Sequence, residues 1–312
     1  MTLAIDVRGL GKRFGRSEVL HDLDLSVPEG QVFALLGPNG AGKTTTINIL
    51  TTLVRPDAGT AMVAGFDVVG QPEDVKARIS LTGQSAAVDE MLTGTENLVM
   101  LGRLSGLGVR GARVRAAALL DRFGLADAAG RRVRTYSGGM RRRLDLALSL
   151  VVTPPVIFLD EPTTGLDTRS RQSLWSEIHE LARAGTTVFL TTQYLEEADQ
   201  LADRIAVLDQ GRVAAEGTAS ELKSRVGGDV VELRSPDDEL LAELPTDGSV
   251  HALRAAIDTL DRTEAAAREG VRIAIRRPSL DDVFLAITGG AAASDRTGSA
   301  PAASHDLIGT KG

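Results

Sequence analysis

The chain has 312 residues, contains no cysteine and carries a formal net charge of −7 at pH 7. This length allows one large domain and a small one. The absence of cysteine excludes disulfide bonds and cysteine-ligated metals, and the acidic balance gives no sign of a nucleic-acid-binding surface. Residues 1–15 lack the pattern of a signal peptide, and no run approaches the ~18 apolar residues of a membrane-spanning helix. We therefore expect a chain that does not enter a membrane by itself.

The first 36 residues have the pattern of β-strands. Residues 20–27 alternate between apolar and polar side chains, as in a strand with one buried face. Residues 3–10 and the apolar run 31–36 are further strand candidates. Phe14 lies in the loop between the first two strands, where its ring could stack on a purine base. A partly buried loop aromatic without such a role is the alternative.

Residues 37–45 have the sequence GPNGAGKTT, which matches the Gly-x-x-x-x-Gly-Lys-Thr pattern of a phosphate-binding loop. An apolar strand precedes the loop and a helical pattern follows it, so the loop lies at a helix N-terminus that favours an anion. Lys43 supplies positive charge for the β- and γ-phosphates, and the Thr44 hydroxyl is a candidate magnesium ligand. The sequence predicts a nucleoside triphosphate site made by Gly37, Pro38, Asn39, Gly40, Ala41, Gly42, Lys43, Thr44 and Thr45.

Gln84 follows a short strand at 78–83, at a strand end that would face the nucleotide in an open sheet. Its amide could contact magnesium or the attacking water, whereas an ordinary surface glutamine is the alternative. From residue 91 to 151 the pattern becomes helical, beginning with the capping box Thr93-Gly94-Thr95-Glu96.

Ser137, Gly138 and Gly139 precede a helix with one apolar face. The N-terminus of such a helix can hold an anion beside the serine hydroxyl. In the simpler alternative, the serine caps the helix and does nothing more.

The apolar run at 155–159 ends in Asp160 and Glu161 and suits a parallel strand that is buried on both faces. Asp160 at the carboxyl end of this strand can hold magnesium, through water, and Glu161 can orient or deprotonate a water molecule. Asp167 follows in a tight turn. Another buried strand, at 186–193, ends at Gln193.

Around residue 221 the pattern changes. Residues 230–235, 249–254 and 271–277 have the pattern of short strands, and an apolar stripe after Pro278 predicts a final helix. We expect a small α+β domain over residues 221–290. Residues 291–312, rich in Ala, Ser, Gly and Pro without a period, are predicted to be a disordered tail.

Five elements in order make the chain resemble the ATP-binding subunit of an ABC transporter, and the match covers about residues 3–220. This resemblance implies an α/β fold, the P-loop NTPase ABC cassette, over residues 1–220. Such a cassette has a mostly parallel sheet core, an N-terminal antiparallel β subdomain and an α-helical signature subdomain at about 85–150. The elements are GPNGAGKT at 37–44, Gln84, SGGM at 137–140, VIFLDE at 156–161 and GLD at 165–167.

The resemblance also implies the chemistry of the site. ATP and Mg²⁺ would be the cofactors. Phe14 would stack on adenine, Asp167 would belong to the nucleotide site, and Thr44, Gln84 and Asp160 would lie toward the metal. The catalytic residues would be Glu161, Gln193 and Lys43.

Partners follow from the same resemblance. Two cassettes would form a homodimer that sandwiches two ATP molecules, each bound by the phosphate loop of one subunit and by Ser137, Gly138 and Gly139 of the other. Residues 85–130 would receive an integral membrane permease subunit. The protein would therefore be peripheral, at the cytoplasmic face of the cell membrane, with no nucleic acid among its partners.

Two segments sharpen the resemblance. Residues 191–213 and 276–289 are similar to the daunorubicin-resistance (DrrA-like) subgroup, which favours the export of a drug or antibiotic. One alternative is the ATPase subunit of an importer or of a lipid or polysaccharide exporter, and the DrrA-like ending argues against it. The other is a soluble ABC-type ATPase that acts on nucleic acid or ribosomes, and the acidic single cassette argues against it.

Two positions depart from the usual family pattern. Gln193 stands where the family usually has histidine, and Met140 stands where it usually has glutamine. A glutamine amide still donates a hydrogen bond, but it carries no proton at neutral pH. Since DrrA-like members share this glutamine, we interpret Gln193 as a trait of the subgroup.

Overall fold

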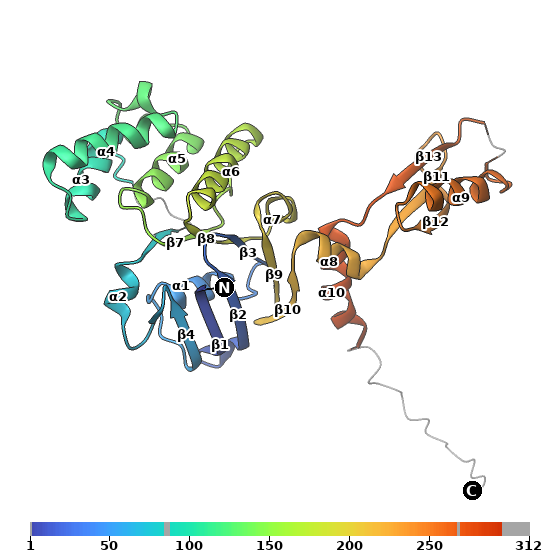
Figure 1. Ribbon diagram of the computed structural model, residues 1–312, viewed down its shortest axis with the longest axis horizontal. Coiled ribbons are helices and arrows are strands. Elements are labelled where there is room, and N and C mark those ends of the chain that lie inside the picture. Colours follow the sequence, from blue (N-terminus) through green and yellow to red (C-terminus); the bar gives the residue numbers. More distant parts are fainter. Residues whose placement is uncertain (1, 84–87, 267–268, 295–312) are drawn as a thin grey trace, which may run out of the picture. The chain divides into compact units, whose positions relative to one another are not determined.

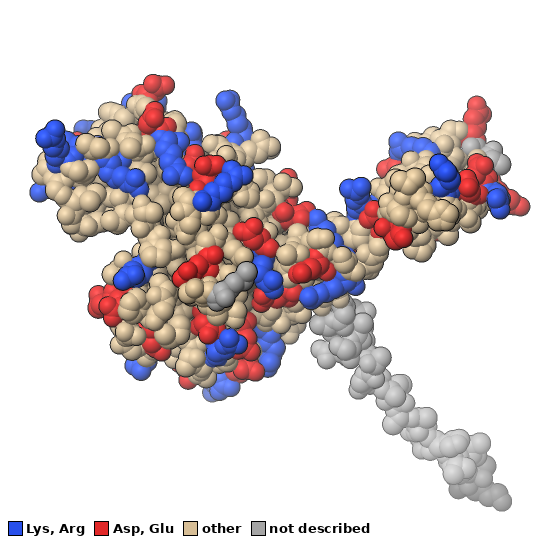
Figure 2. All heavy atoms as spheres, in the orientation of Figure 1, with Lys and Arg blue, Asp and Glu red and all other residues tan. Residues whose placement is uncertain are grey.

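The computed structural model describes residues 2–83, 88–266 and 269–294. The chain divides between Leu222 and Lys223 into two compact units, whose elements are labelled in Figure 1. On the face shown in Figure 2, acidic and basic side chains are interspersed over the surface of both units. No helix in the described part of the chain is both long enough and apolar enough to cross a bilayer.

An antiparallel sheet of four strands opens the first unit, in the order β2-β1-β4-β5. The alternation predicted at 20–27 is confirmed, because Leu23, Leu25 and Val27 are buried while Asp24 and Ser26 between them are not. The first loop is shorter than predicted, since Phe14 is the last residue of its strand and pairs with Ser17. The strands are β1 (Leu3–Phe14), β2 (Ser17–Pro28), β4 (Ala58–Val63) and β5 (Phe66–Asp67).

A six-stranded sheet forms the centre of the first unit, in the order β10-β9-β3-β8-β7-β6. All neighbouring strands are parallel except β10, which runs antiparallel to β9. Every residue of β3, β7 and β8 is buried, as the apolar runs predicted for strands covered on both faces. The strands are β3 (Val32–Leu36), β6 (Ile79–Thr82), β7 (Val156–Asp160), β8 (Thr187–Thr192), β9 (Arg204–Asp209) and β10 (Arg212–Gly217).

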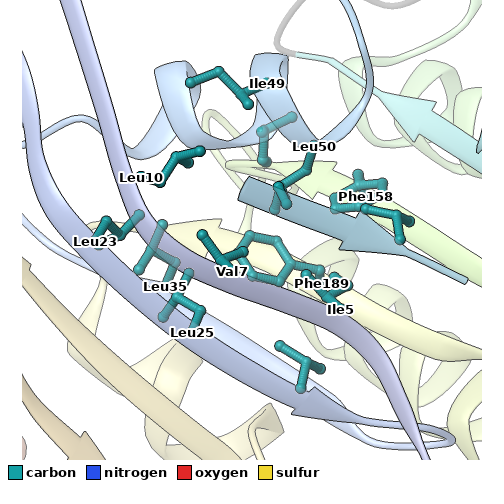
Figure 3. Close-up of a cluster of buried hydrophobic side chains, with 14 of the residues drawn as sticks. Ile5, Val7, Leu10, Leu23, Leu25, Leu35, Ile49, Leu50, Phe158 and Phe189 are labelled. Atoms are coloured by element: carbon teal, nitrogen blue, oxygen red, sulfur yellow. The ribbon is translucent and has the colours of Figure 1, made fainter. Parts of the chain in front are cut away.

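The main hydrophobic core joins the two sheets. Helix α1 (Lys43–Leu50) contacts β2 and β4 of one sheet and β7 and β8 of the other. Figure 3 shows its Ile49 and Leu50 in one cluster with side chains from both sheets, among them Leu10 and Phe158. The phosphate loop that precedes α1 is therefore anchored by a helix that is buried between the layers.

Helices α6 (Thr168–Arg183) and α7 (Leu195–Leu201) contact β3 and β8. The helical segment contains α3 (Gly94–Leu104), α4 (Val109–Arg122) and α5 (Gly138–Ser149), and α2 (Pro72–Lys76) precedes it. The predicted capping box is confirmed, because the Thr93 hydroxyl accepts from the N–H of Glu96 and the Glu96 carboxylate accepts from the N–H of Thr93.

The second unit has an antiparallel sheet in the order β12-β11-β13 and a small core formed by Val231, Leu233, Ala256 and Leu260. The strand predicted at 249–254 is wrong. Ser249 caps helix α9, and Leu253, Ala256, Ile257 and Leu260 recur at helical spacing and pack in this core. The elements are α8 (Ala219–Val226), which spans the division, β11 (Asp229–Arg234), β12 (Leu240–Thr246), α9 (Val250–Asp261), β13 (Arg272–Arg276) and α10 (Leu280–Ser294).

Helix α10 continues to Ser294, beyond the boundary at residue 290 that the sequence predicts. The rest of the predicted tail, residues 295–312, lies outside the described residues.

Candidate active site

The phosphate loop connects β3 to α1 and lines a cavity of about 350 Å³. Gly42 has a φ of 109°, and a Cβ at this position would lie 2.6 Å from Cδ2 of Leu20. A residue with a side chain would therefore be both strained and crowded there. The residues that line the cavity are Val19, Asn39, Gly40, Gly42, Lys43, Thr44, Thr45 and Glu161.

The ammonium group of Lys43 lies within this loop, and the Lys43 side chain is only 5% exposed. It donates hydrogen bonds to the carbonyl oxygens of Gly37 (2.8 Å) and Pro38 (3.1 Å). It also lies 3.5 Å from Oε1 of Glu161, whose side chain is 12% exposed. A cation and a carboxylate thus meet at the wall of one cavity, where water has limited access.

The hydroxyl group of Thr44 donates to Oδ2 of Asp160 at 3.1 Å, and the Thr191 hydroxyl donates to Oδ1 of the same carboxylate. Asp160 is buried at the end of β7. Hydroxyl and carboxylate oxygens are the donors that Mg²⁺ prefers, and Mg²⁺ usually completes its shell with water and substrate phosphates. Among the described residues, no group of three or more His, Asp or Glu side chains could hold a metal ion. The donor set therefore fits a magnesium ion that is bound together with a nucleotide.

Glu161 has an unusual backbone conformation, with a φ of 48°. Its N–H lies 3.1 Å from both the carbonyl and the hydroxyl oxygen of Thr191. Non-glycine residues in this region cost of order 1–3 kcal/mol and persist where the surroundings enforce them. The fold therefore directs this carboxylate into the cavity at a cost in backbone strain.

Ser137 caps helix α5, its hydroxyl accepting from the N–H of Met140 at 3.2 Å. The neighbouring Gly138 is exposed and Gly139 is buried. Among the described residues that line the phosphate-loop cavity, none belongs to this Ser-Gly-Gly segment. Gly138 instead lines a second cavity, of about 270 Å³, which Glu161 also lines.

Asp167 caps helix α6 by accepting from the N–H and the hydroxyl of Ser170, both at 2.9 Å. These hydrogen bonds lower the pKa of the Asp167 carboxyl. Asp167 is not among the described residues that line the phosphate-loop cavity. It lines a separate polar cavity together with Arg143, Arg169 and Ser173.

Three predicted residues remain. Phe14 is 50% exposed, with the Lys12 ammonium 5.2 Å from its ring centre, so one face of the ring already has a cation beside it. Gln193 is half-buried and directly follows β8. Gln84 lies outside the described residues, and the last described residue before it is Gly83, which directly follows β6.

Two charged side chains near the site, Arg142 with little exposure and Glu197 fully buried, were missed by the sequence reasoning. The Arg142 side chain is 11% exposed and contacts the ends of β6 and β7. Glu197 is 1% exposed on α7, and the indole N–H of Trp175 donates to its Oε1 at 3.4 Å. Burial raises the pKa of Glu197, opposed by the nearby hydroxyls of Thr192 and Thr163 and by Trp175. Both residues occur in runs of like charge that are typical of solvated helix faces, so the sequence carried no signal of burial.

A strand, a glycine-rich phosphate loop and a helix, with two carboxylates at the end of another parallel strand of the same sheet, define a nucleoside triphosphatase of the P-loop type. The family model described as ABC transporter matches residues 20–164. The chain belongs to the ATP-binding subunits of ABC transporters, as the relatives that match over most of its length establish.

The chain is 54% identical over 310 residues to the daunorubicin/doxorubicin resistance ATP-binding protein DrrA of Streptomyces peucetius, covering 92% of this chain and 93% of the relative. It is 48% identical to the doxorubicin resistance ATP-binding protein DrrA of Mycobacterium tuberculosis, with 92% and 94% covered. It is 40% identical to the Nod factor export ATP-binding protein I of Burkholderia lata, with 91% and 97% covered.

Solved structures agree with the fold. The structure described as an ATP binding subunit of an ABC transporter shares 28% identity and a TM-score of 0.65, covering 72% of this chain and 93% of that chain. The dimeric post-hydrolysis state of an ATP-binding cassette bound to ADP and Pi shares 24% identity and a TM-score of 0.63, covering 69% and 98%. The second match shows the fold alone.

Proposed function

We propose that this chain hydrolyses ATP to drive the export of a drug or antibiotic through a separate integral membrane permease subunit. The observation that carries the ATPase half is the Glu161 carboxylate, 3.5 Å from the Lys43 ammonium in the phosphate-loop cavity. The export half is supported by the names of the drug-resistance and Nod factor export relatives. Identity to the drug-resistance protein is 54% and to the Nod factor export protein 40%, so a drug is the preferred cargo class.

In the proposed reaction, water attacks the γ-phosphorus of ATP in line with the bond to the leaving ADP oxygen. Glu161 orients this water and accepts its proton, and Lys43 stabilises charge on the β- and γ-phosphate oxygens. Gln193 donates an amide hydrogen bond toward the γ-phosphate. Magnesium, held by Thr44, Asp160 and Gln84, would neutralise the phosphate oxygens when bound.

A second copy of the chain would complete the site. The Ser-Gly-Gly segment lies outside the described lining of its own phosphate-loop cavity, while its Gly138 is exposed at the N-terminus of a 12-residue helix. We propose that these groups bind the ATP held by the partner, where the helix N-terminus favours phosphate. In the same dimer Phe14 stacks on adenine, and Asp167 lies at the interface near the nucleotide.

The proposed partner in the membrane is a permease that docks on residues 85–130, so that the protein is peripheral at the cytoplasmic face. No described helix could itself cross the bilayer. The face in Figure 2 carries interspersed acids and bases in place of the continuous basic surface expected of a nucleic-acid-binding protein. This favours the transporter over the soluble ATPase on nucleic acid or ribosomes.

The test has two stages. Affinity purification of the full chain from membranes should recover an integral membrane protein, whereas recovery of RNA or DNA would favour the soluble ATPase. Inverted vesicles that contain the recovered complex should then accumulate doxorubicin when ATP is added.

The Glu161→Gln variant should lose about 10²–10⁴-fold in turnover and in transport while it still binds ATP. The matched control Glu180→Gln, at an exposed surface ion pair, should behave like wild type. Undiminished ATP hydrolysis in Glu161→Gln would refute the assignment of Glu161.

A further inference from the structure

Arg142, on the first turns of α5, contacts the backbone at the ends of two paired strands of the six-stranded sheet, β7 and the edge strand β6. Its Nε donates to the carbonyl oxygen of Pro162 (2.8 Å), its Nη1 to that of Gly83 (2.8 Å) and its Nη2 to that of Asp160 (3.3 Å). Oδ2 of the buried Asp145 lies 3.3 Å from Nη1 and supplies the opposing charge. The planar guanidinium group thus bridges three backbone carbonyls from two separate segments of the chain.

Two of these carbonyls flank Glu161. The oxygen of Asp160 belongs to the peptide group before Glu161, and the oxygen of Pro162 belongs to the peptide group that follows Pro162. Glu161 itself is in the left-handed region, and its N–H is held by Thr191. Backbone in this region needs contacts that over-determine it. Thr191 fixes the N–H side of the segment and Arg142 fixes the carbonyl side.

We propose that Arg142 is a positioning residue for Glu161, the carboxylate that orients the attacking water. Because Arg142 is part of α5, the helix that Ser137 caps, α5 controls the geometry of this carboxylate through Arg142. This inference rests on the proposed function of Glu161. The third carbonyl, of Gly83, directly precedes Gln84, so the same side chain also holds the segment that leads into this predicted site residue. A displacement of α5 when the Ser-Gly-Gly segment engages a nucleotide would thereby reach Glu161 of the same chain.

Arg115 is the matched control, because it makes similar contacts away from the site. Its guanidinium group donates to the carbonyl oxygens of Leu150 and Val151 and to the hydroxyl of Thr153. If these partly buried arginine–carbonyl bonds served only to stabilise the fold, Arg115→Gln and Arg142→Gln would have the same effect on turnover.

The experiment measures ATP turnover by the full chain, with its membrane partner where one is recovered. A misplacement of about 1 Å at a reacting group costs about 10²-fold, so Arg142→Gln should lower kcat by about that factor and leave the KM for ATP little changed. Arg142→Lys should lose most of the same activity, because a single ammonium nitrogen cannot reach all three carbonyls that the three guanidinium nitrogens contact separately. Arg115→Gln should keep wild-type kcat. If Arg142→Gln fails to fold, as judged by circular dichroism, the lysine variant carries the test.

A double variant separates positioning of Glu161 from an independent effect. If Arg142 acts through Glu161, adding Arg142→Gln to Glu161→Gln should give no further loss in single-turnover hydrolysis. Wild-type kcat in both Arg142 variants, or losses that multiply in the double variant, would overturn the proposal. Wild-type turnover in Glu161→Gln alone would instead refute the proposed function on which the inference rests.

Discussion

The hydroxyl group of Thr44 and the carboxylate of Asp160 lie 3.1 Å apart, although 116 positions separate the two residues in the chain. Thr44 is in the first turn of α1, and Asp160 ends β7. The sheet order places β8 between β3 and β7, with all three strands parallel. Their carboxyl ends therefore meet at one edge of the sheet, which is where ligands bind in open α/β folds.

This pair predicts that Asp160→Asn weakens magnesium binding. Asparagine keeps the shape of aspartate but removes its charge, and loss of a group that orients a metal ion typically costs 10–100-fold in affinity. The Mg²⁺ concentration that gives half-maximal ATPase activity should rise by about that factor, while binding of nucleotide without the metal should be retained. Titration of Mg²⁺ at fixed ATP is the measurement. The control Asp121→Asn, at an exposed position on α4, should follow the wild-type curve, and an unchanged curve for Asp160→Asn would count against the metal assignment.

Gln193 is predicted to act by hydrogen bonding. Gln193→Ala removes the amide donor and should lower steady-state ATPase activity sharply, whereas Gln193→His keeps a donor and should preserve it. The comparison control is Gln200→Ala, an exposed glutamine on α7. Wild-type activity in Gln193→Ala would make this residue a bystander.

Glu197 is predicted to make stability depend on pH. Burial raises the pKa of Glu197 in the folded chain. At pH values between the ordinary pKa of glutamate, about 4.3, and this raised pKa, Glu197 is therefore protonated in the folded state and ionised in the unfolded state. The unfolding free energy should therefore fall as the pH rises through this window. Glu197→Gln keeps the acceptor for Trp175 and has no charge to bury, so it should lose less stability between pH 5 and pH 8.

Urea denaturation at both pH values measures this difference. Glu196→Gln, at the exposed neighbouring position, is the control and should show the wild-type dependence on pH. If the Glu197→Gln and Glu196→Gln variants lost the same amount of stability between pH 5 and pH 8, burial of the Glu197 charge would not be the cause of the pH dependence.

Local patterns predicted much of the fold correctly. Leu23, Leu25 and Val27 have the period of two that a strand with one buried face imposes, and the buried runs that end at Leu36 and Asp160 are continuous because both faces of those strands are covered. The phosphate loop was recognisable because its chemistry needs glycine, lysine and threonine at fixed spacing within nine residues.

Other features depend on partners far away in the chain. The helix α9 begins like a strand, and its helical period emerges only when the sequence is followed to Leu260. Thr191 holds Asp160 and Glu161 from the neighbouring strand, and Arg142 holds carbonyls 18, 20 and 59 positions away. A run of three arginines gives no sign of which side chain turns inward, because tertiary packing decides it.

The last prediction concerns Gly139, which packs against α6. A Cβ added there would lie 2.5 Å from Oγ and 3.0 Å from Cβ of Ser170, and Ser170 cannot easily turn away because its hydroxyl donates to Asp167. Alanine favours a helix over glycine by about 1 kcal/mol, but overpacking costs about 1–3 kcal/mol. Gly139→Ala should therefore lower the free energy of unfolding or leave it unimproved. Gly138→Ala is the matched control, because an added Cβ there meets nothing within 4 Å.

Urea denaturation of the single variants and of a double variant tests this contact. Gly138→Ala should be at least as stable as wild type, and Gly139→Ala should be less stable than Gly138→Ala. Ser170→Gly removes both atoms that the new methyl group would meet, so Gly139→Ala should cost less in the Ser170→Gly background than in wild type. Equal stability of Gly138→Ala and Gly139→Ala, with no coupling to Ser170, would show that α5 and α6 do not pack closely enough at this point to require glycine.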